Sequence, residues 1–247
     1  MKMEEIKKQL DEIYRDIHKC HKCPDMCPSK ELRRSDAVNP HADVFIISQA
    51  LAENTLRKTG VQFFDKNGEP GDTGRNLEKF LNQFNRTIYP PSLIELGPGV
   101  RIRARKPEFL TVYNTDLAQC YPGKKKTGKG GDRKPKKCEV EECTNAGFIQ
   151  HEMEIIKPKL VLLMGTVSTN SFFEFFGKYM TESCWHKGLN LEEHINQIVK
   201  QRSLPLFQIS TLTANVCPIY HASGANNGRF PKMIQTDLIN LLAGALK

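Results

Sequence analysis

Four short apolar runs, rich in strand-forming residues and separated by segments of helical periodicity, constrain the fold of this chain most. The runs lie at 43–48, 109–116, 159–165 and 204–210. Apolar residues at helical spacing occupy the segments 3–18, 77–84, 148–156, 167–176 and 231–246. Strands that alternate with helices favour a parallel sheet covered on both faces. The pattern predicts an α/β fold, a three-layer α/β/α sandwich around a small, mostly parallel, four-stranded sheet.

Three segments interrupt this alternation, and we interpret them as insertions in a single domain that spans residues 1–247. They lie near 89–106, 121–137 and 177–203, and an N-terminal helix with several cysteines occupies residues 1–30. In an open α/β sheet the binding crevice lies beyond the carboxyl ends of the strands. The polar residues that follow the predicted strands therefore indicate a functional site along that one edge.

The positive charge of the chain is concentrated in one segment. The chain has 36 Lys and Arg against 28 Asp and Glu, a formal net charge of +8. Between Tyr121 and Lys137 there are eight basic residues and a single acid, so this segment carries nearly all of the excess. The composition therefore excludes a uniformly basic surface. Lysines on such a Gly-rich segment make sequence-independent phosphate contacts, and we expect Lys124, Lys125 and Lys126 to contact the phosphates of a nucleic acid.

The first residues are charged and contain no apolar stretch of the length that a signal peptide needs. The longest apolar run, 160–165, is far shorter than the roughly 20 residues of a membrane span. We therefore expect an intracellular, cytoplasmic protein with no membrane partner. In a reducing compartment, the eight cysteines indicate metal ligation or buried thiols rather than disulfides.

Cysteine spacing gives the clearest metal-binding signal. Cys20-x-x-Cys23 is a metal-ligand spacing, because a tight turn can direct both thiolates at one site. Pairing it with Cys138 and Cys143 would complete a zinc site of four thiolates. Spacing alone leaves zinc, an iron–sulfur cluster and inert buried cysteines open.

A series of motifs follows in a specific order along the chain. They are Cys20-x-x-Cys23, Gly60-Val61-Gln62-Phe63, Asp116-Leu117-Ala118-Gln119-Cys120-Tyr121-Pro122, Gly131-Asp132-Arg133-Lys134-Pro135 with Cys143, Ile156-Lys157-Pro158-Lys159-Leu160-Val161, and His221-Ala222-Ser223 with Arg229-Phe230. In this order and spacing, from about residue 17 to 245, the chain resembles the iron–sulfur uracil-DNA glycosylases called families four and five.

The resemblance implies a DNA-repair enzyme with the same α/β/α fold. Such an enzyme flips a deaminated base, chiefly uracil, out of DNA and hydrolyses the N-glycosidic bond in base excision repair. The resemblance also implies a structural [4Fe–4S] cluster, a cofactor that suits four thiolates. The implied ligands are Cys20, Cys23, Cys120 and Cys143. We expect a monomer whose partner is DNA.

The resemblance assigns further roles residue by residue. His221 would donate a hydrogen bond to the uracil oxygen that gains charge, and Phe63 would stack on the flipped base. Ser223 would contact a phosphate. The loop that follows Ser223, with Asn226 and Arg229, would enter the groove and contact DNA.

Two positions depart from the family pattern. Gln49 replaces a glutamate in the first motif, so it can orient a water molecule but cannot act as a general base. Asp116 replaces a uracil-reading asparagine, and a carboxylate only accepts hydrogen bonds. Asp116 should weaken uracil discrimination unless it is protonated, or unless Asn114 or a backbone amide reads the O4 oxygen.

Two alternatives to a glycosylase remain open on the sequence. The altered first motif allows a non-catalytic DNA-binding relative. The cysteines and the lysine-rich segment also allow a zinc-containing, basic nucleic-acid-binding protein.

Overall fold

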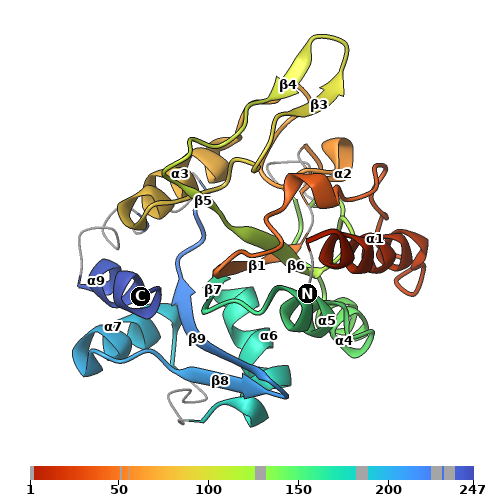
Figure 1. Ribbon diagram of the computed structural model, residues 1–247. Helices are drawn as coiled ribbons and strands as arrows, with labels where there is room; N and C mark the ends of the chain where they lie inside the picture. Colours follow the sequence, from red (N-terminus) through yellow and green to blue (C-terminus); the bar gives the residue numbers. More distant parts are fainter. Residues whose placement is uncertain are drawn as a thin grey trace.

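A central sheet of five strands, in the order β6-β1-β7-β9-β8, organises the structure (Figure 1). This computed structural model describes residues 3–50, 52–54, 56–125, 132–181, 189–223, 230 and 237–247. The strands are β1 (Val44–Ala50), β6 (Tyr113–Ala118), β7 (Leu160–Met164), β8 (Leu206–Ile209) and β9 (Leu212–Ile219). β6, β1, β7 and β9 run parallel, whereas β8 pairs antiparallel with β9 at one edge.

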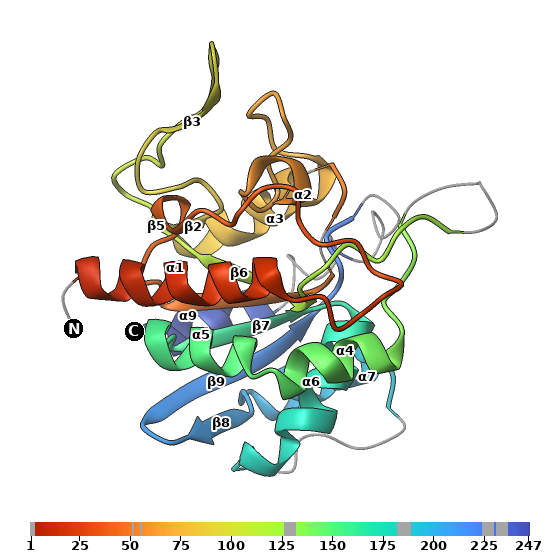
Figure 2. The same ribbon diagram turned by 90° about the vertical axis from the view of Figure 1, so that its right-hand side faces the viewer.

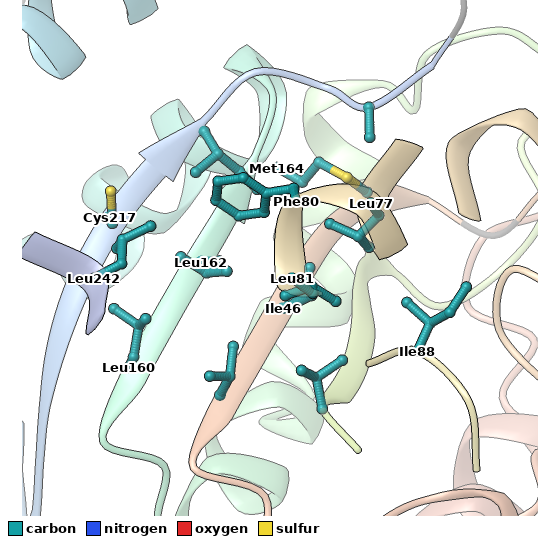
Figure 3. Close-up of a cluster of buried hydrophobic side chains, with 14 of the residues drawn as sticks. Ile46, Leu77, Phe80, Leu81, Ile88, Leu160, Leu162, Met164, Cys217 and Leu242 are labelled. Atoms are coloured by element: carbon teal, nitrogen blue, oxygen red, sulfur yellow. The ribbon is translucent and has the colours of Figure 1, made fainter. Parts of the chain in front are cut away.

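Side chains of successive strand residues alternate between the two faces of the sheet, and helices cover both faces. Val44 and Ile46 pack with α3 (Asp72–Leu81), α7 (Leu191–Gln201) and α9 (Leu238–Ala245), and Figure 3 shows part of this core. Phe45 and Ile47 pack on the opposite face. The helices that cover that face are α1 (Met3–Lys19), α4 (Lys137–Asn145), α5 (Phe148–Ile156) and α6 (Thr166–Phe176). This arrangement confirms the predicted three-layer α/β/α sandwich.

Shorter elements connect these layers. They are α2 (Leu56–Thr59), β2 (Arg86–Thr87), β3 (Ile94–Gly97), β4 (Val100–Ile102), β5 (Leu110–Thr111) and 3-10 helices at Ser35–Ala37, Asn82–Phe84 and Gly177–Tyr179. β3 and β4 form an antiparallel hairpin that projects from the rest of the molecule in both views (Figures 1 and 2). Within the described part of the chain, no helix is both long enough and apolar enough to cross a membrane.

The sheet has one strand more than the sequence predicts. The run 204–210 contains the antiparallel edge strand β8, and the parallel strand that leads to His221 is the unpredicted β9. Thr213, Asn215 and Pro218 interrupt the apolar pattern of β9 and hide it. The predicted strand 109–116 is divided into β5 and β6.

The predicted insertions have different structures. Segment 89–106 contains the β3–β4 hairpin, whereas 177–203 includes α7, whose apolar side chains pack into the core on the α3 face. Part of segment 121–137 lies outside the described residues.

Candidate active site and thiol pocket

The four parallel strands end along one edge of the sheet, and a cavity of about 320 Å³ lies there. We call it the base cavity. Its walls include residues from β1, β6, β7 and the segment after β9, together with the turn before α3. They include Ser48, Gln62, Phe63, Gly74, Asp116, Met164, His221 and Ser223. A crevice at this edge is where open α/β sheets bind ligands.

Asp116 is fully buried and is held as an acceptor. Its Oδ2 atom accepts from Nη2 of Arg33 at 3.1 Å, and Nε2 of Gln62 lies 3.3 Å from Oδ1 and 3.2 Å from Oδ2. Burial raises the pKa of the Asp116 carboxyl group, while Arg33 and Gln62 act in the opposite direction. Because both of its neighbours donate hydrogen bonds, the geometry is that of an ionised carboxylate.

Arg33 connects Asp116 to a second buried carboxylate. Arg33 Nη1 donates to Thr115 Oγ1 at 3.1 Å and lies 3.6 Å from Glu152 Oε1. Glu152 also accepts from Tyr113 Oη at 2.8 Å and from Thr115 Oγ1 at 2.6 Å. Thr115 and Asp116 are successive residues of the edge strand β6, so Arg33 reaches both faces of the sheet at that edge. One guanidinium thus balances two buried acids.

His221 follows β9 and is held in place by its neighbours. Its Nδ1 atom accepts from the Ser223 N–H at 3.2 Å, and Asn76 Nδ2 on α3 donates to the Ala222 carbonyl at 2.8 Å. Gly165, at φ +89°, gives the ring room, because a Cβ there would lie 3.3 Å from Cβ of His221. Burial lowers the pKa of His221, so the imidazole stays neutral at neutral pH. With Nδ1 as acceptor, the neutral ring carries its proton on Nε2.

Phe63 lies in the wall of the base cavity with an unusual backbone. Its φ angle is +68°, in the left-handed region, and its carbonyl accepts from the Gly71 N–H at 3.0 Å. The turn that leads to Phe63 needs Gly60, since a Cβ there would lie 2.3 Å from the Leu32 carbonyl oxygen. Strained backbone of this kind is often found at functional sites.

Other predicted site residues lie next to the base cavity or outside the described chain. Gln49 and Lys134 line a neighbouring cavity of about 580 Å³, which shares His221 and Ser223 with the base cavity. Asn114 lines a separate small cavity with Arg33 and Gln62 and is not among the residues that line the base cavity. The predicted DNA-binding residues Lys126, Asn226 and Arg229 lie outside the described residues.

A second cavity, of about 140 Å³, is lined by four thiols, and we call it the thiol cavity. They are Cys20 and Cys23 after α1, Cys120 after β6 and Cys143 in α4. These are the four cysteines that the resemblance implies as cluster ligands, and the structure brings them together. Burial raises the pKa of Cys120 to about 12 and that of Cys143 to about 11, so a metal must displace their protons.

The two remaining cysteines of this region do not line the thiol cavity. Cys27 and Cys138 are both exposed. Within the described ranges, no three His, Cys, Asp or Glu side chains are arranged so that they could hold a metal ion directly.

Much of the charge in segment 121–137 is paired within the protein. Lys124 Nζ lies 3.0 Å from both Glu53 Oε2 and Asp132 Oδ1, and Arg133 forms two hydrogen bonds with Glu139. Lys136 pairs with Asp25, and Lys137 lies 2.6 Å from Glu174. Of the basic residues described in this segment, Lys125 and Lys134 are exposed and make no ion pair within the described residues.

Two charged residues that the sequence did not predict, Arg33 and Glu152, lie behind the base cavity and connect to Asp116. The sequence contains an indication that Glu152 is buried, because it shares the apolar helical face of Ile149, Met153 and Ile156. It contains no such indication for Arg33, since Arg33 lies in irregular chain between α1 and β1.

A search of curated proteins finds no significant match to this chain. The sequence model of the uracil DNA glycosylase superfamily matches residues 35–241. This match includes every strand of the central sheet and every residue of the base cavity, and leaves out Arg33 and the Cys20–Cys23 pair. The chain therefore belongs to the uracil DNA glycosylase superfamily, whose general activity is the hydrolysis of N-glycosidic bonds in DNA.

Proposed function

We propose that this protein excises a deaminated base, chiefly uracil, from DNA and so acts in base excision repair. The observation that carries the proposal is the base cavity, which gathers an aromatic ring, a neutral imidazole and a buried carboxylate. These groups belong to Phe63, His221 and Asp116. A base can occupy such a cavity only after it has left the DNA stack. Inside the cavity, Phe63 would stack on the base.

His221 would stabilise the departing base. Breaking the glycosidic bond places positive charge on the sugar and negative charge on the base, including the O2 oxygen next to the broken bond. A hydrogen bond from Nε2 of His221 to O2 becomes stronger as that charge develops, so it lowers the barrier. The Ser223 N–H at Nδ1 supports this role, because it keeps the proton of the neutral ring on Nε2.

Gln49 would orient the attacking water. It lines the cavity that shares His221 and Ser223 with the base cavity, so a water held there can approach the sugar. An amide cannot take up the proton of that water at neutral pH. In this proposal stabilisation of the leaving base contributes most of the rate enhancement, and Gln49 contributes by positioning.

We also propose that Cys20, Cys23, Cys120 and Cys143 hold a [4Fe–4S] cluster. The four thiols fit a group larger than a single ion, because they surround a cavity of about 140 Å³. A zinc ion would need four donors about 2.3 Å from one point. The cluster would take no part in base removal. The four cysteines would link the end of α1, the end of β6 and α4.

An excision assay tests the enzymatic proposal. The protein is incubated with single- and double-stranded DNA containing uracil, hypoxanthine, xanthine or a mismatched base, and the DNA is then treated with alkali. We expect strand breaks at uracil in wild-type reactions and a large loss of breaks with His221→Ala. DNA binding without any break would support the alternative of a non-catalytic DNA-binding relative. The replacement of the family's glutamate by Gln49 is the feature that favours this alternative.

Metal analysis separates the cluster from the zinc alternative. Protein purified without oxygen should be brown and contain about four irons per chain. A colourless protein with one zinc per chain would contradict the cluster proposal and favour a zinc-containing nucleic-acid-binding protein.

A further inference from the structure

The base cavity contains a buried hydroxyl group that has no hydrogen-bond partner among the residues that the structure describes. Ser48, near the end of β1, is 5% exposed and lines the cavity, yet its Oγ atom makes no hydrogen bond within the described structure. A buried polar group without a hydrogen bond is costly, so most such groups are paired. An unpaired hydroxyl in a cavity wall therefore indicates a partner that arrives with a ligand.

Ser48 lies directly beside Asp116. The two residues are register partners on the parallel strands β1 and β6, so their side chains project from the same face of the sheet. Both line the base cavity. Asp116 accepts hydrogen bonds only, and within the described part of the chain its Oδ1 atom receives a contact from Gln62 alone. Oδ1 therefore retains the capacity to accept another hydrogen bond, whereas Ser48 can donate one.

We propose that Ser48 is a specificity-determining residue that donates a hydrogen bond to the base carbonyl next to the N–H read by Asp116. This inference rests on the proposed function. In uracil the pair would read N3–H and O4, which leaves O2 to His221. Ser48 thus supplies the donor that Asp116 lacks and that Asn114, outside the base cavity, is not placed to supply.

The Asp116–Ser48 pair fits a lactam edge, in which a ring N–H stands beside a carbonyl. Uracil, hypoxanthine and xanthine all have this edge. Cytosine and adenine instead present a ring nitrogen lone pair beside an amino group, and that lone pair faces the Asp116 carboxylate unfavourably. Thymine and guanine share the lactam edge, so their exclusion depends on the shape of the cavity.

Ser48→Ala is a clean test variant. Because the hydroxyl makes no hydrogen bond to any described residue, its removal leaves none of those residues unpaired and should not lower the melting temperature. Ser171→Ala on α6 is the matched control, since its serine does not line either cavity beside His221.

The experiment measures binding to DNA that carries one 2′-fluoro nucleotide, which resists cleavage, with uracil, 4-thiouracil or 2-thiouracil as its base. Sulfur is a poor hydrogen-bond acceptor, and both analogues retain N3–H. We expect Ser48→Ala to weaken binding of the uracil DNA about five- to tenfold. The substitution should have no further effect with 4-thiouracil, but its full effect with 2-thiouracil.

Equal losses on all three DNAs, or no loss on uracil DNA, would overturn the role of Ser48. If wild-type protein still excises uracil in that case, the proposed function stands without it. If wild-type protein neither excises uracil nor prefers the uracil DNA over undamaged DNA, the proposed function and the role of Ser48 both fall.

Discussion

The base cavity and the thiol cavity lie at two ends of one short stretch of chain, since Asp116 lines the first and Cys120 the second. Their chemistry differs. Four of the side chains that line the thiol cavity are cysteines, whereas the base cavity combines an aromatic ring, an imidazole, a hydroxyl and a carboxylate. We propose that the thiol cavity holds one group permanently. In the base cavity, Ser48 Oγ has no partner among the described residues, and a transient ligand can satisfy it.

We expect the largest effect from a substitution in the thiol cavity. Cys120→Ser replaces one of the four proposed cluster ligands, which lies between α1 and α4, so we expect loss of the iron, a lower melting temperature and loss of activity. Cys138→Ser is the control, because Cys138 is exposed and does not line the cavity. Iron content and thermal unfolding provide the measurements. Full iron content in Cys120→Ser would show that Cys120 is not a ligand.

We expect the next largest effect from removal of Arg33, the cation behind the base cavity. Arg33→Met leaves Asp116 and Glu152 buried without their shared guanidinium, and breaking a buried pair costs about 3–5 kcal/mol. We expect the free energy of unfolding in urea to fall by that amount. The exposed pair of Arg101 and Glu95 is the comparison, since Arg101→Met should change it by less than about 1 kcal/mol. Similar losses in both variants would mean that Arg33 is not a buried structural cation.

His221→Ala tests the base cavity itself. Loss of a donor to developing charge costs about 10²–10³ in the rate of the chemical step. Single-turnover excision of uracil measures that rate, and an unchanged melting temperature shows that the fold is intact. A decrease of less than about threefold, well under that range, would remove His221 from the proposed mechanism.

These two cavities were not equally predictable. The four cysteines of the thiol cavity were predicted, but not from spacing alone, which paired Cys20 and Cys23 with Cys138 and Cys143. The family resemblance implied Cys120 in place of Cys138. Phe63, Asp116 and His221 were also predicted, because they stand in recognisable motifs. Ser48 and Arg33 were not, since their roles depend on the register of β1 with β6 and on a loop that packs against the sheet edge. The α/β/α layers followed from apolar periodicity, but β9 did not, because polar residues and Pro218 interrupt its pattern.

A smaller effect concerns pH. Burial raises the pKa of Asp116. The groups that face its carboxylate are Arg33, in the segment between α1 and β1, and Gln62. Glu152 on α5 lies next to Arg33 as well. Both oxygens of an ionised Asp116 accept hydrogen bonds, whereas a protonated carboxyl group would direct its O–H among the donors Arg33 and Gln62 and the base N–H. Uracil excision should therefore fall as the pH is lowered through that raised pKa. His221, whose pKa is lowered, stays neutral until a more acidic pH. In Asp116→Asn, the decrease in uracil excision that comes from protonation of Asp116 should disappear, and the substrate range should change. An identical pH–rate profile and substrate range would contradict the assignment of Asp116 to base reading.

The same raised pKa values affect stability in a defined direction. Burial raises the pKa of both Asp116 and Glu152 above the values of an unfolded chain, so the folded state binds more protons. Their contribution to the free energy of unfolding is therefore greatest at low pH, and it decreases as the pH rises through the raised values. The free energy of unfolding in urea, measured for the wild type and for Asp116→Asn at a series of pH values, shows this contribution as the difference between the two proteins.

The smallest effect concerns the basic segment. Lys125→Ala and Lys134→Ala remove exposed cations that make no ion pair within the described residues, and each should reduce the salt dependence of DNA binding by about one phosphate contact. Lys137→Ala is the control, because Lys137 pairs with Glu174. If the control lowers the salt dependence as much as the other two variants, internal pairing does not decide which lysines bind DNA.

We propose that the protein excises a base bound in the base cavity. The most direct measurement is the release of free uracil from a DNA strand with a single uracil, followed together with alkali-sensitive breakage at that position. We predict that the two products appear in equal amounts with wild-type protein and that His221→Ala forms both at least about a hundredfold more slowly. Absence of both products from wild-type reactions in which the DNA is bound would contradict the proposed excision of uracil.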